Sequence, residues 1–194
     1  MKTLFLLYIV LLAGCAAQSP PSRFFILGPV AEPATTRYAN LLVGVGPVDL
    51  ADYLNRNQMV HRDTEVRLQL DEFNRWAGDH GKNITTVLAE NLARLLGSDG
   101  VLPYPWSSSL DLDYQVVVAI RRFDAGRDNR VILDAQWQLF GKQPQKLLAI
   151  QRSHIEVPAT DGSQEALVNA QSQALARLGK VIAVAVRATA DHDR

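Results

Sequence analysis

The stretch RVILDAQWQL at residues 130–139 decides the fold of this chain. Its apolar side chains stand at every second position, which is the period of a β-strand with one buried face. The stretch 114–120 before it is apolar at nearly every position and predicts a central strand paired with the first. The polar segment 124–129 predicts the turn between them. After a second predicted turn at 141–144, alternation resumes at 146–157 and predicts the third strand of an antiparallel meander.

Two other segments change to the helical period. Residues 83–96 and 163–188 carry apolar side chains three and four positions apart, which gives each an apolar stripe. Gly97 is a typical residue just past the end of a helix. Amphipathic helices bury their stripes economically when they lie on one face of a sheet. We therefore predict an α+β fold, a mostly antiparallel sheet of about six strands with two amphipathic helices packed on one face.

The remaining strands lie toward the N-terminus. Residues 24–27 and 41–48 are short apolar runs that predict strands, and 51–55 predicts a helical turn or loop. Residues 59–62 and 65–70 predict a hairpin that turns at Asp63 and Thr64, with its second arm half exposed.

The first residues have the features of a secreted and lipid-modified protein. Lys2 is followed by an apolar run at 4–12 that is too short to span a membrane, and then by small residues. Leu12-Ala13-Gly14-Cys15 resembles the bacterial lipobox, which implies cleavage before Cys15 and a diacylglycerol and an acyl chain on that residue. We predict a signal peptide at 1–14, an acylated cysteine and tether at 15–23, and a single domain at 24–190. In enterobacterial lipoproteins Asp after the cysteine retains the protein in the inner membrane, and by that resemblance Ala16 implies sorting to the outer membrane.

Composition excludes several classes of function. Among 194 residues, 20 basic side chains balance 20 acidic ones, so no positive field favours a nucleic-acid partner. The single cysteine excludes an internal disulfide and cysteine-based zinc or iron–sulfur sites.

We find no pattern of residues that predicts catalysis. Ser107, Ser108 and Ser109 could meet one of four histidines, His61, His80, His154 or His192, but no nucleophile elbow surrounds the serines. The carboxylate pairs Asp71–Glu72 and Asp111–Asp113 could serve acid–base chemistry or bind calcium, yet the remaining ligands of a calcium loop are missing. We interpret these pairs as solvated strand ends. The sequence predicts no enzyme, no metal and no cofactor.

Aromatic and apolar residues near turns are the candidates for a partner interface. They are Tyr53, Leu54, Arg75, Trp76 and Trp106. Aromatic residues and arginine are enriched in protein–protein interfaces. Packing in the core is the alternative for the two tryptophans, and it is the preferred interpretation of Trp137.

A series of segments in fixed order resembles one family. They are RNQMVHR at 56–62, EFNRWA at 72–77, VLAENL at 87–92, PW at 105–106, DY at 113–114, RFD at 122–124, LDAQW at 133–137, ALARL at 174–178 and IA at 182–183. Together with the lipobox they resemble the PqiC/YmbA family of ABC-type transport auxiliary lipoproteins. One departure is Ala77-Gly78-Asp79, where the family more often has Ala-Glu-Pro-Leu, so a partner contact at this loop would have a different geometry.

The resemblance implies a non-catalytic outer-membrane lipoprotein that faces the periplasm. Its partners would be an MCE-domain protein and an inner-membrane permease, in phospholipid traffic that maintains the envelope, and it would assemble as a homo-oligomer. A second hypothesis is a lipoprotein that binds glycan or lipopolysaccharide, or plugs an outer-membrane barrel. The oligomeric state distinguishes the two.

Overall fold

The structure is a computed structural model that describes residues 20–142 and 146–192. Within these ranges the strands are β1 (Arg23–Phe25), β2 (Val43–Leu50), β3 (Gln58–Thr64), β4 (Arg67–Trp76), β5 (Val101–Pro103), β6 (Tyr114–Gly126), β7 (Arg130–Gly141) and β8 (Leu147–Pro158). The helices are α2 (His80–Leu96), α3 (Gln164–His192) and the short 3-10 helix η2 (Asp52–Leu54). The predicted signal peptide and Cys15 lie outside the described residues.

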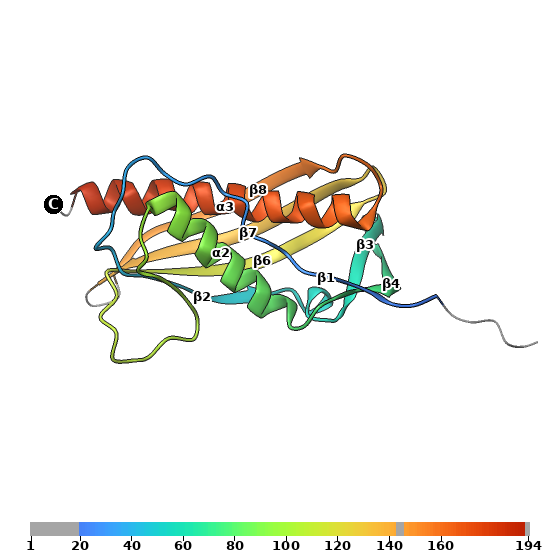
Figure 1. Ribbon diagram of the computed structural model, residues 1–194, viewed down its shortest axis with the longest axis horizontal. Helices are drawn as coiled ribbons and strands as arrows, with labels where there is room; N and C mark the ends of the chain where they lie inside the picture. The colour runs from blue at the N-terminus through green and yellow to red at the C-terminus, as the bar shows by residue number, and fades with distance from the viewer. Residues whose placement is uncertain (1–19, 143–145, 193–194) are drawn as a thin grey trace, which may run out of the picture.

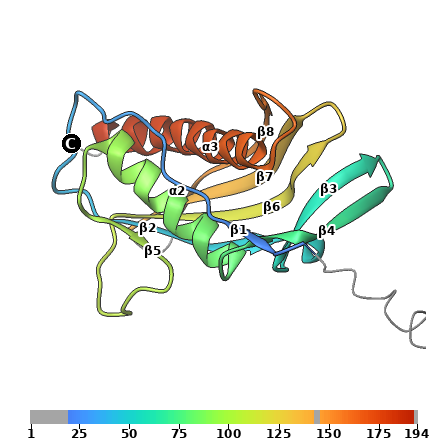
Figure 2. The same ribbon diagram turned by 45° about the vertical axis from the view of Figure 1, so that its right-hand side comes forward.

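The strands form one sheet, and α2 and α3 lie together on the same face of it (Figures 1 and 2). α3 packs over β7 and β8, and α2 packs over β2 and β5. In the described residues, neither α2 nor α3 lies on the opposite face of the sheet. The predicted α+β class, with both helices on one face, is confirmed.

The sheet is mixed in direction. β6, β7 and β8 form the predicted antiparallel meander, and β3 and β4 form an antiparallel hairpin. β2 pairs in parallel with β5 and β6 because α2 lies between them in the chain, and such a crossover returns the chain in the same direction. The pairing of β1 with β4 is also parallel. β6 is central as predicted, with β7 on one side and β2 and then β3 on the other.

The core fills the space between the sheet and the two helices. Its largest fully buried side chains are Trp137, Phe123, Ile84, Leu88, Leu92, Leu96, Ile120, Leu133, Leu139, Leu175, Leu178 and Ile182. Burying each leucine or isoleucine of this set stabilises the fold by roughly 1.5–3 kcal/mol. Trp137 satisfies its indole N–H by donating to Ser153 Oγ at 3.1 Å. The preferred interpretation of Trp137 as a core residue is confirmed.

Caps fix both ends of α2. The Asp79 side chain accepts a hydrogen bond from the Lys82 backbone N–H at 2.9 Å, so the helix begins at His80 rather than at the predicted Asn83. Gly97 ends the helix in the left-handed conformation, with φ of 58°, as predicted.

Two asparagines of α2 hold the segment that follows β1. Asn83 Oδ1 accepts from the Leu27 N–H and Asn91 Oδ1 from the Ala31 N–H, each at 2.9 Å. The segment therefore lies across the outer side of α2, as Figure 1 shows in blue.

A β-bulge changes the end of β6. Ile120 faces Ala135 and Arg122 faces Asp134, so Arg121 is the additional residue. After the bulge Phe123 points to the helices and Asp124 to the opposite face. The predicted turn at 124–129 is therefore wrong at its start, because β6 continues to Gly126.

The hairpin and the short strands also differ in detail from the prediction. β3 continues through Thr64, so the turn is formed by Glu65 and Val66 rather than by Asp63 and Thr64. β5 was not predicted, since three residues give too short a pattern. In the part of the chain that the structure describes, every helix is too short or too polar to cross a membrane.

Candidate functional site

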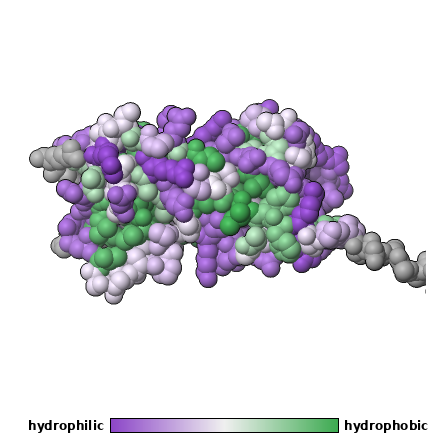
Figure 3. Space-filling view, viewed as in Figure 1, coloured by the Kyte–Doolittle hydropathy of each residue, from purple (hydrophilic) through white to green (hydrophobic). Residues whose placement is uncertain are grey.

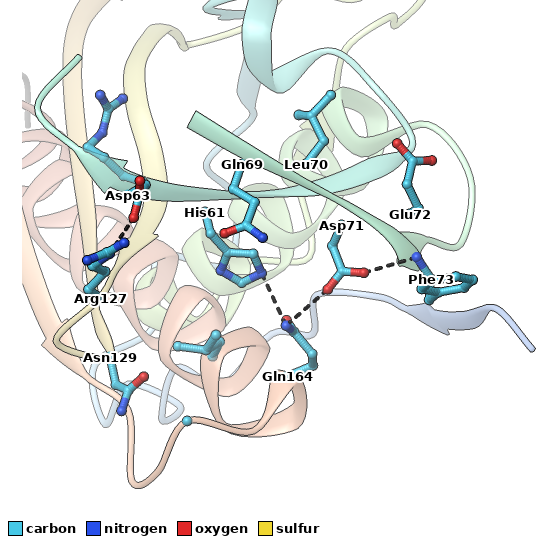
Figure 4. Close-up of a pocket in the computed structure, with 14 residues that line it drawn as sticks. His61, Asp63, Gln69, Leu70, Asp71, Glu72, Phe73, Arg127, Asn129 and Gln164 are labelled. Carbon is cyan, nitrogen blue, oxygen red and sulfur yellow. Dashed lines mark hydrogen bonds and ion pairs between the residues drawn. The ribbon is translucent and has the colours of Figure 1, made fainter. Parts of the chain in front are cut away.

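A cleft of about 590 Å³ lies where the β3–β4 hairpin meets the first turn of α3 (Figure 4). The hairpin forms one wall. The turn between β6 and β7 and the start of α3 form the other. The cleft is therefore assembled from three segments that are far apart in the sequence.

Three polar side chains from three elements meet in this cleft (Figure 4). The Gln164 amide nitrogen lies 3.1 Å from His61 Nε2 and donates to Asp71 Oδ2 at 3.4 Å. Burial lowers the pKa of His61, so its neutral Nε2 accepts the hydrogen bond from Gln164. Burial raises the pKa of Asp71, but hydrogen bonds from Asn74 and from the Phe73 backbone lower it by more. The pKa of Asp71 is therefore below its ordinary value. The array thus holds a neutral imidazole beside a carboxylate.

Ion pairs fix the mouth of the cleft at the hairpin turn. Asp63 pairs with both Arg67 of β4 and Arg127 of the β6–β7 turn. Desolvation raises the pKa of Asp63, but the two arginines outweigh it and lower the pKa. Arg62 Nη1 also donates to the Glu65 carbonyl oxygen at 3.1 Å. The turn is therefore fixed by ion pairs on either side of it and by a hydrogen bond to its own backbone.

A stack of rings lies beneath the cleft. The His80 imidazole stacks on Trp76 with ring centroids 4.0 Å apart and lies 6.1 Å from the Phe123 ring. Burial lowers the pKa of His80 to about 3, against a weaker opposing effect of the Asp79 charge. His80 is therefore a neutral packing residue.

A buried carboxylate organises the opposite face of the sheet. Asp124 is fully buried and receives hydrogen bonds from Tyr53 Oη at 2.7 Å, Arg62 Nη2 at 3.0 Å and Arg122 Nε at 3.0 Å. Burial, and then the bond to Asp124, raise the pKa of Tyr53 to about 12. The two arginines compensate the charge, which otherwise would be costly to bury.

Beyond this cluster the face that carries no helix is mostly polar. On β7 and β8, Asp134, His154, Glu156 and Arg130 form a chain of charged contacts, in which Arg130 Nη1 donates to Glu156 Oε2 at 2.7 Å. Hydrogen bonds that the ring of His154 donates to Asp134 and then to Glu156 raise the pKa of His154. Ile150 is an exposed apolar residue on the same face.

The structure separates the five predicted interface residues. Leu54 and Trp76 are buried in the core, so they have a packing role and offer little surface to a partner. Tyr53 is half-buried with its hydroxyl bonded to Asp124. Arg75 is half exposed and donates to the Glu72 carbonyl oxygen at 3.0 Å. An interface role stays a prediction for these two residues and for Trp106.

Trp106 is half-buried against β2. Its ring meets Tyr104 edge to face at 5.3 Å between centroids. A side chain at Gly44 would come within 2.8 Å of the Trp106 ring, so glycine is needed for this close packing. The loop that carries Trp106 is thereby fixed to the body of the domain.

The cleft lacks the parts of a hydrolytic site. Within residues 20–142 and 146–192, those that line it include no serine, threonine or cysteine to act as nucleophile. Ser107 and Ser109 bond to each other at 2.8 Å in a loop away from the cleft. No group of three or more His, Cys, Asp or Glu side chains in the described residues is placed to hold a metal ion.

Sequence reasoning missed two of these groups. The interpretation of Asp71 as a solvated strand end is wrong, because Asp71 accepts three hydrogen bonds from Phe73 and Asn74. An aspartate with asparagine three positions later is typical of such a local turn. Asp124 was assigned to a turn, and no local pattern revealed the bulge that buries it.

Comparison with known proteins gives consistent matches. The family model described as ABC-type transport auxiliary lipoprotein component matches residues 26–183. The chain is 28% identical over 173 residues to the intermembrane transport lipoprotein PqiC of Escherichia coli (strain K12), covering 82% of this chain and 90% of that protein. PqiC of Shigella flexneri matches with the same identity and coverage.

Solved structures share the fold. Protein XCC0632 from Xanthomonas campestris superimposes with a TM-score of 0.72 at 14% identity, covering 89% of this chain and all of the other. A crystal structure of an uncharacterized protein also gives 0.72, at 21% identity and 86% coverage of this chain. At these identities the likeness shows the fold alone.

Proposed function

The chain belongs to the family of ABC-type transport auxiliary lipoprotein components, and from that premise we propose that it is the outer-membrane lipoprotein of an intermembrane lipid transport system. The observation that carries the proposal is the extent of the match. It runs from just after β1 to the second half of α3, so it includes the whole sheet except β1. The likeness is to the complete domain rather than to a single motif.

The proposed anchor is Cys15. It is the single cysteine of the sequence and follows Leu12-Ala13-Gly14. A diacylglycerol and an additional acyl chain supply more than two chains, and two suffice for stable attachment to a bilayer. The periplasmic face of the outer membrane is the proposed location.

The proposed role is docking rather than catalysis. The cleft holds a histidine and carboxylates but no nucleophile among its described residues. The proposed partners are an MCE-domain protein and an inner-membrane permease, with phospholipid as the transported molecule. No cofactor is proposed beyond the lipid on Cys15.

The outer edge of β8 and the adjoining face of the sheet support a homo-oligomer. Among the strands of the described residues, β8 pairs with β7 alone, so its outer edge presents backbone groups along twelve residues, Leu147–Pro158. Leu147 and Ile150 are exposed on this strand. An open edge of this length favours contact with another chain. We propose that a second copy covers this edge and the adjoining face.

Native mass spectrometry of the lipidated protein, extracted gently from its own membranes, tests the proposal. A homo-oligomer that carries an MCE-domain protein and phospholipid is the expected result. A Cys15→Ser chain, which lacks the acylation site, should be lost from the membrane fraction. A monomer bound to glycan, lipopolysaccharide or an outer-membrane barrel would overturn the proposal in favour of the second hypothesis.

A further inference from the structure

The β3–β4 hairpin extends beyond the part of the sheet that the helices cover, as Figure 2 shows at its right-hand side. β1 runs parallel to the last residues of β4, with Arg23 opposite Asn74 and Phe25 opposite Trp76. Because of this direction, the chain enters β1 from the side on which the hairpin turn lies. The described chain before β1 therefore comes from the same end of the domain as the hairpin turn, and Cys15 precedes this segment in the sequence.

The length of the tether matches the length of the hairpin. Cys15 lies eight positions before Arg23, and Val66 lies eight positions before Asn74, the partner of Arg23. An extended chain covers about 3.3–3.6 Å per residue, so both intervals span at most about 26–29 Å. A bilayer that holds Cys15 therefore lies at most about 29 Å from Arg23, which is also the longest distance that the eight residues from Val66 to Asn74 can span.

One of the two residues of the turn is apolar and exposed. Val66 is 96% exposed in a two-residue turn, where glycine, asparagine and aspartate are favoured. A single exposed valine is ordinary on a protein surface. Here, however, the ion pairs of Asp63 with Arg67 and Arg127 hold the turn, so its outward direction is fixed.

Further apolar side chains lie between the turn and the body of the domain. Leu70 and Phe73 of β4 and Phe24 of β1 are exposed. Figure 3 shows apolar areas on both halves of the molecule, one of them on the right-hand half, where the hairpin lies in Figure 1. This end of the domain thus combines the entry of the chain into β1, a projecting turn and apolar side chains.

We propose that the turn of the β3–β4 hairpin rests on the lipid leaflet that holds the acylated Cys15, with Val66 in the headgroup region. The inference rests on the lipid anchor of the proposed function. A single valine binds a bilayer weakly, but the tether converts its contact into an intramolecular event with a high effective concentration. The hairpin then sets the distance and tilt of the domain relative to the membrane.

Fluorescence of a labelled hairpin tests this contact. The full lipidated chain carrying Val66→Cys is labelled with an environment-sensitive fluorophore and reconstituted in phospholipid vesicles that contain headgroup-labelled quencher lipid. We expect a blue shift and roughly twofold quenching, because interfacial residues lie about 5–10 Å deep. The matched control is Ser108→Cys, in the exposed loop at the opposite end of the molecule, which should keep the emission of a label in water.

A longer tether provides an independent variant. Eight glycine and serine residues inserted between Pro20 and Pro21 double the reach of the anchor without changing the folded domain. Quenching at position 66 should then fall toward the value at position 108. Equal quenching at both positions in the original tether would overturn the contact.

The vesicle assay also separates the two proposals. If the protein floats with vesicles but the label at position 66 stays in water, the hairpin contact is overturned and the lipoprotein role stands. If the lipidated protein does not float with vesicles, the anchor fails, and the proposed function fails with it.

Discussion

The two faces of the sheet reach burial by different means. On the face covered by the helices, Trp137, Leu139 and Leu178 are fully buried by apolar packing. On the other face, Asp124 is equally buried, but by Arg62, Arg122 and Tyr53. The first face is therefore sensitive to changes of volume, and the second to changes of charge.

The largest effect is expected from a volume change on the covered face. Trp137→Ala should lower the free energy of unfolding by about 4–5 kcal/mol, since a large buried ring is replaced by a cavity. Urea unfolding measures the loss. The neighbouring Gln138→Ala, which points to the other face, should change stability by no more than about 0.5 kcal/mol. Equal losses in the two variants would show that the faces do not differ as described.

A charge change on the other face should have the next largest effect. Asp124→Asn keeps the shape of the side chain but leaves Arg62 and Arg122 without their counter-charge, which should cost about 3 kcal/mol. Guanidinium chloride unfolding at neutral pH measures it. Asp134→Asn, a partly exposed carboxylate on the same face, is the control and should lose much less. Similar losses would contradict a special role for the buried charge.

Acid should lower the free energy of unfolding through His80, which lies on the covered face. Its pKa is lowered to about 3 by burial, so between pH 6.5 and 3 the unfolded chain binds more protons than the folded one. Stability should therefore fall as the pH falls below 6.5, by up to about 2 kcal/mol at pH 5. His61, whose pKa is also lowered by burial, contributes in the same direction.

The variant His80→Phe isolates the effect of His80. His80→Phe keeps the stack on Trp76 and should reduce the slope of stability against pH. His154 acts oppositely, because its raised pKa gives a contribution that is present at low pH and is lost as pH rises through the folded value. Identical slopes for His80→Phe and the unmodified chain in thermal unfolding between pH 5 and 7 would contradict the role of His80.

The smallest effect on stability should accompany the largest effect on assembly. Ile150 is 50% exposed on β8, so Ile150→Lys should change the free energy of unfolding by no more than about 0.5 kcal/mol. If a second copy covers this face, the buried lysine should reduce the oligomer to smaller species in native mass spectrometry. An unchanged oligomer would exclude this strand from the interface.

The long periodic elements were predictable from the sequence. The alternation in 130–139 and the helical stripes in 83–96 and 163–188 reflect burial of one face, which acts on every second residue or on every third and fourth. The parallel pairing of β2 was not predictable, since it depends on where α2 places the chain afterwards. β5 is a strand because it pairs with β2, and its three residues are too few to show an alternating pattern.

The polar groups were harder to predict than the elements. His61, Asp71 and Gln164 meet only because the hairpin and the first turn of α3 come together, and no spacing in the sequence records that contact. The tryptophans show the converse. Trp76 stands beside charged and turn-forming residues, which suggested an interface, but stacking on His80 buries it.

The bulge at Arg121 has a consequence for how relatives of this chain are aligned. Deleting that one residue would place Arg122 opposite Asp134 directly after the pair of Ile120 and Ala135, so Phe123 would still face the helices and Asp124 the opposite face. A gap at this position therefore removes the bulge and leaves the two faces of β6 as they are. A single-residue gap placed elsewhere in β6 would instead reverse the residues between the gap and the bulge, so a one-residue length difference in a family alignment belongs at Arg121.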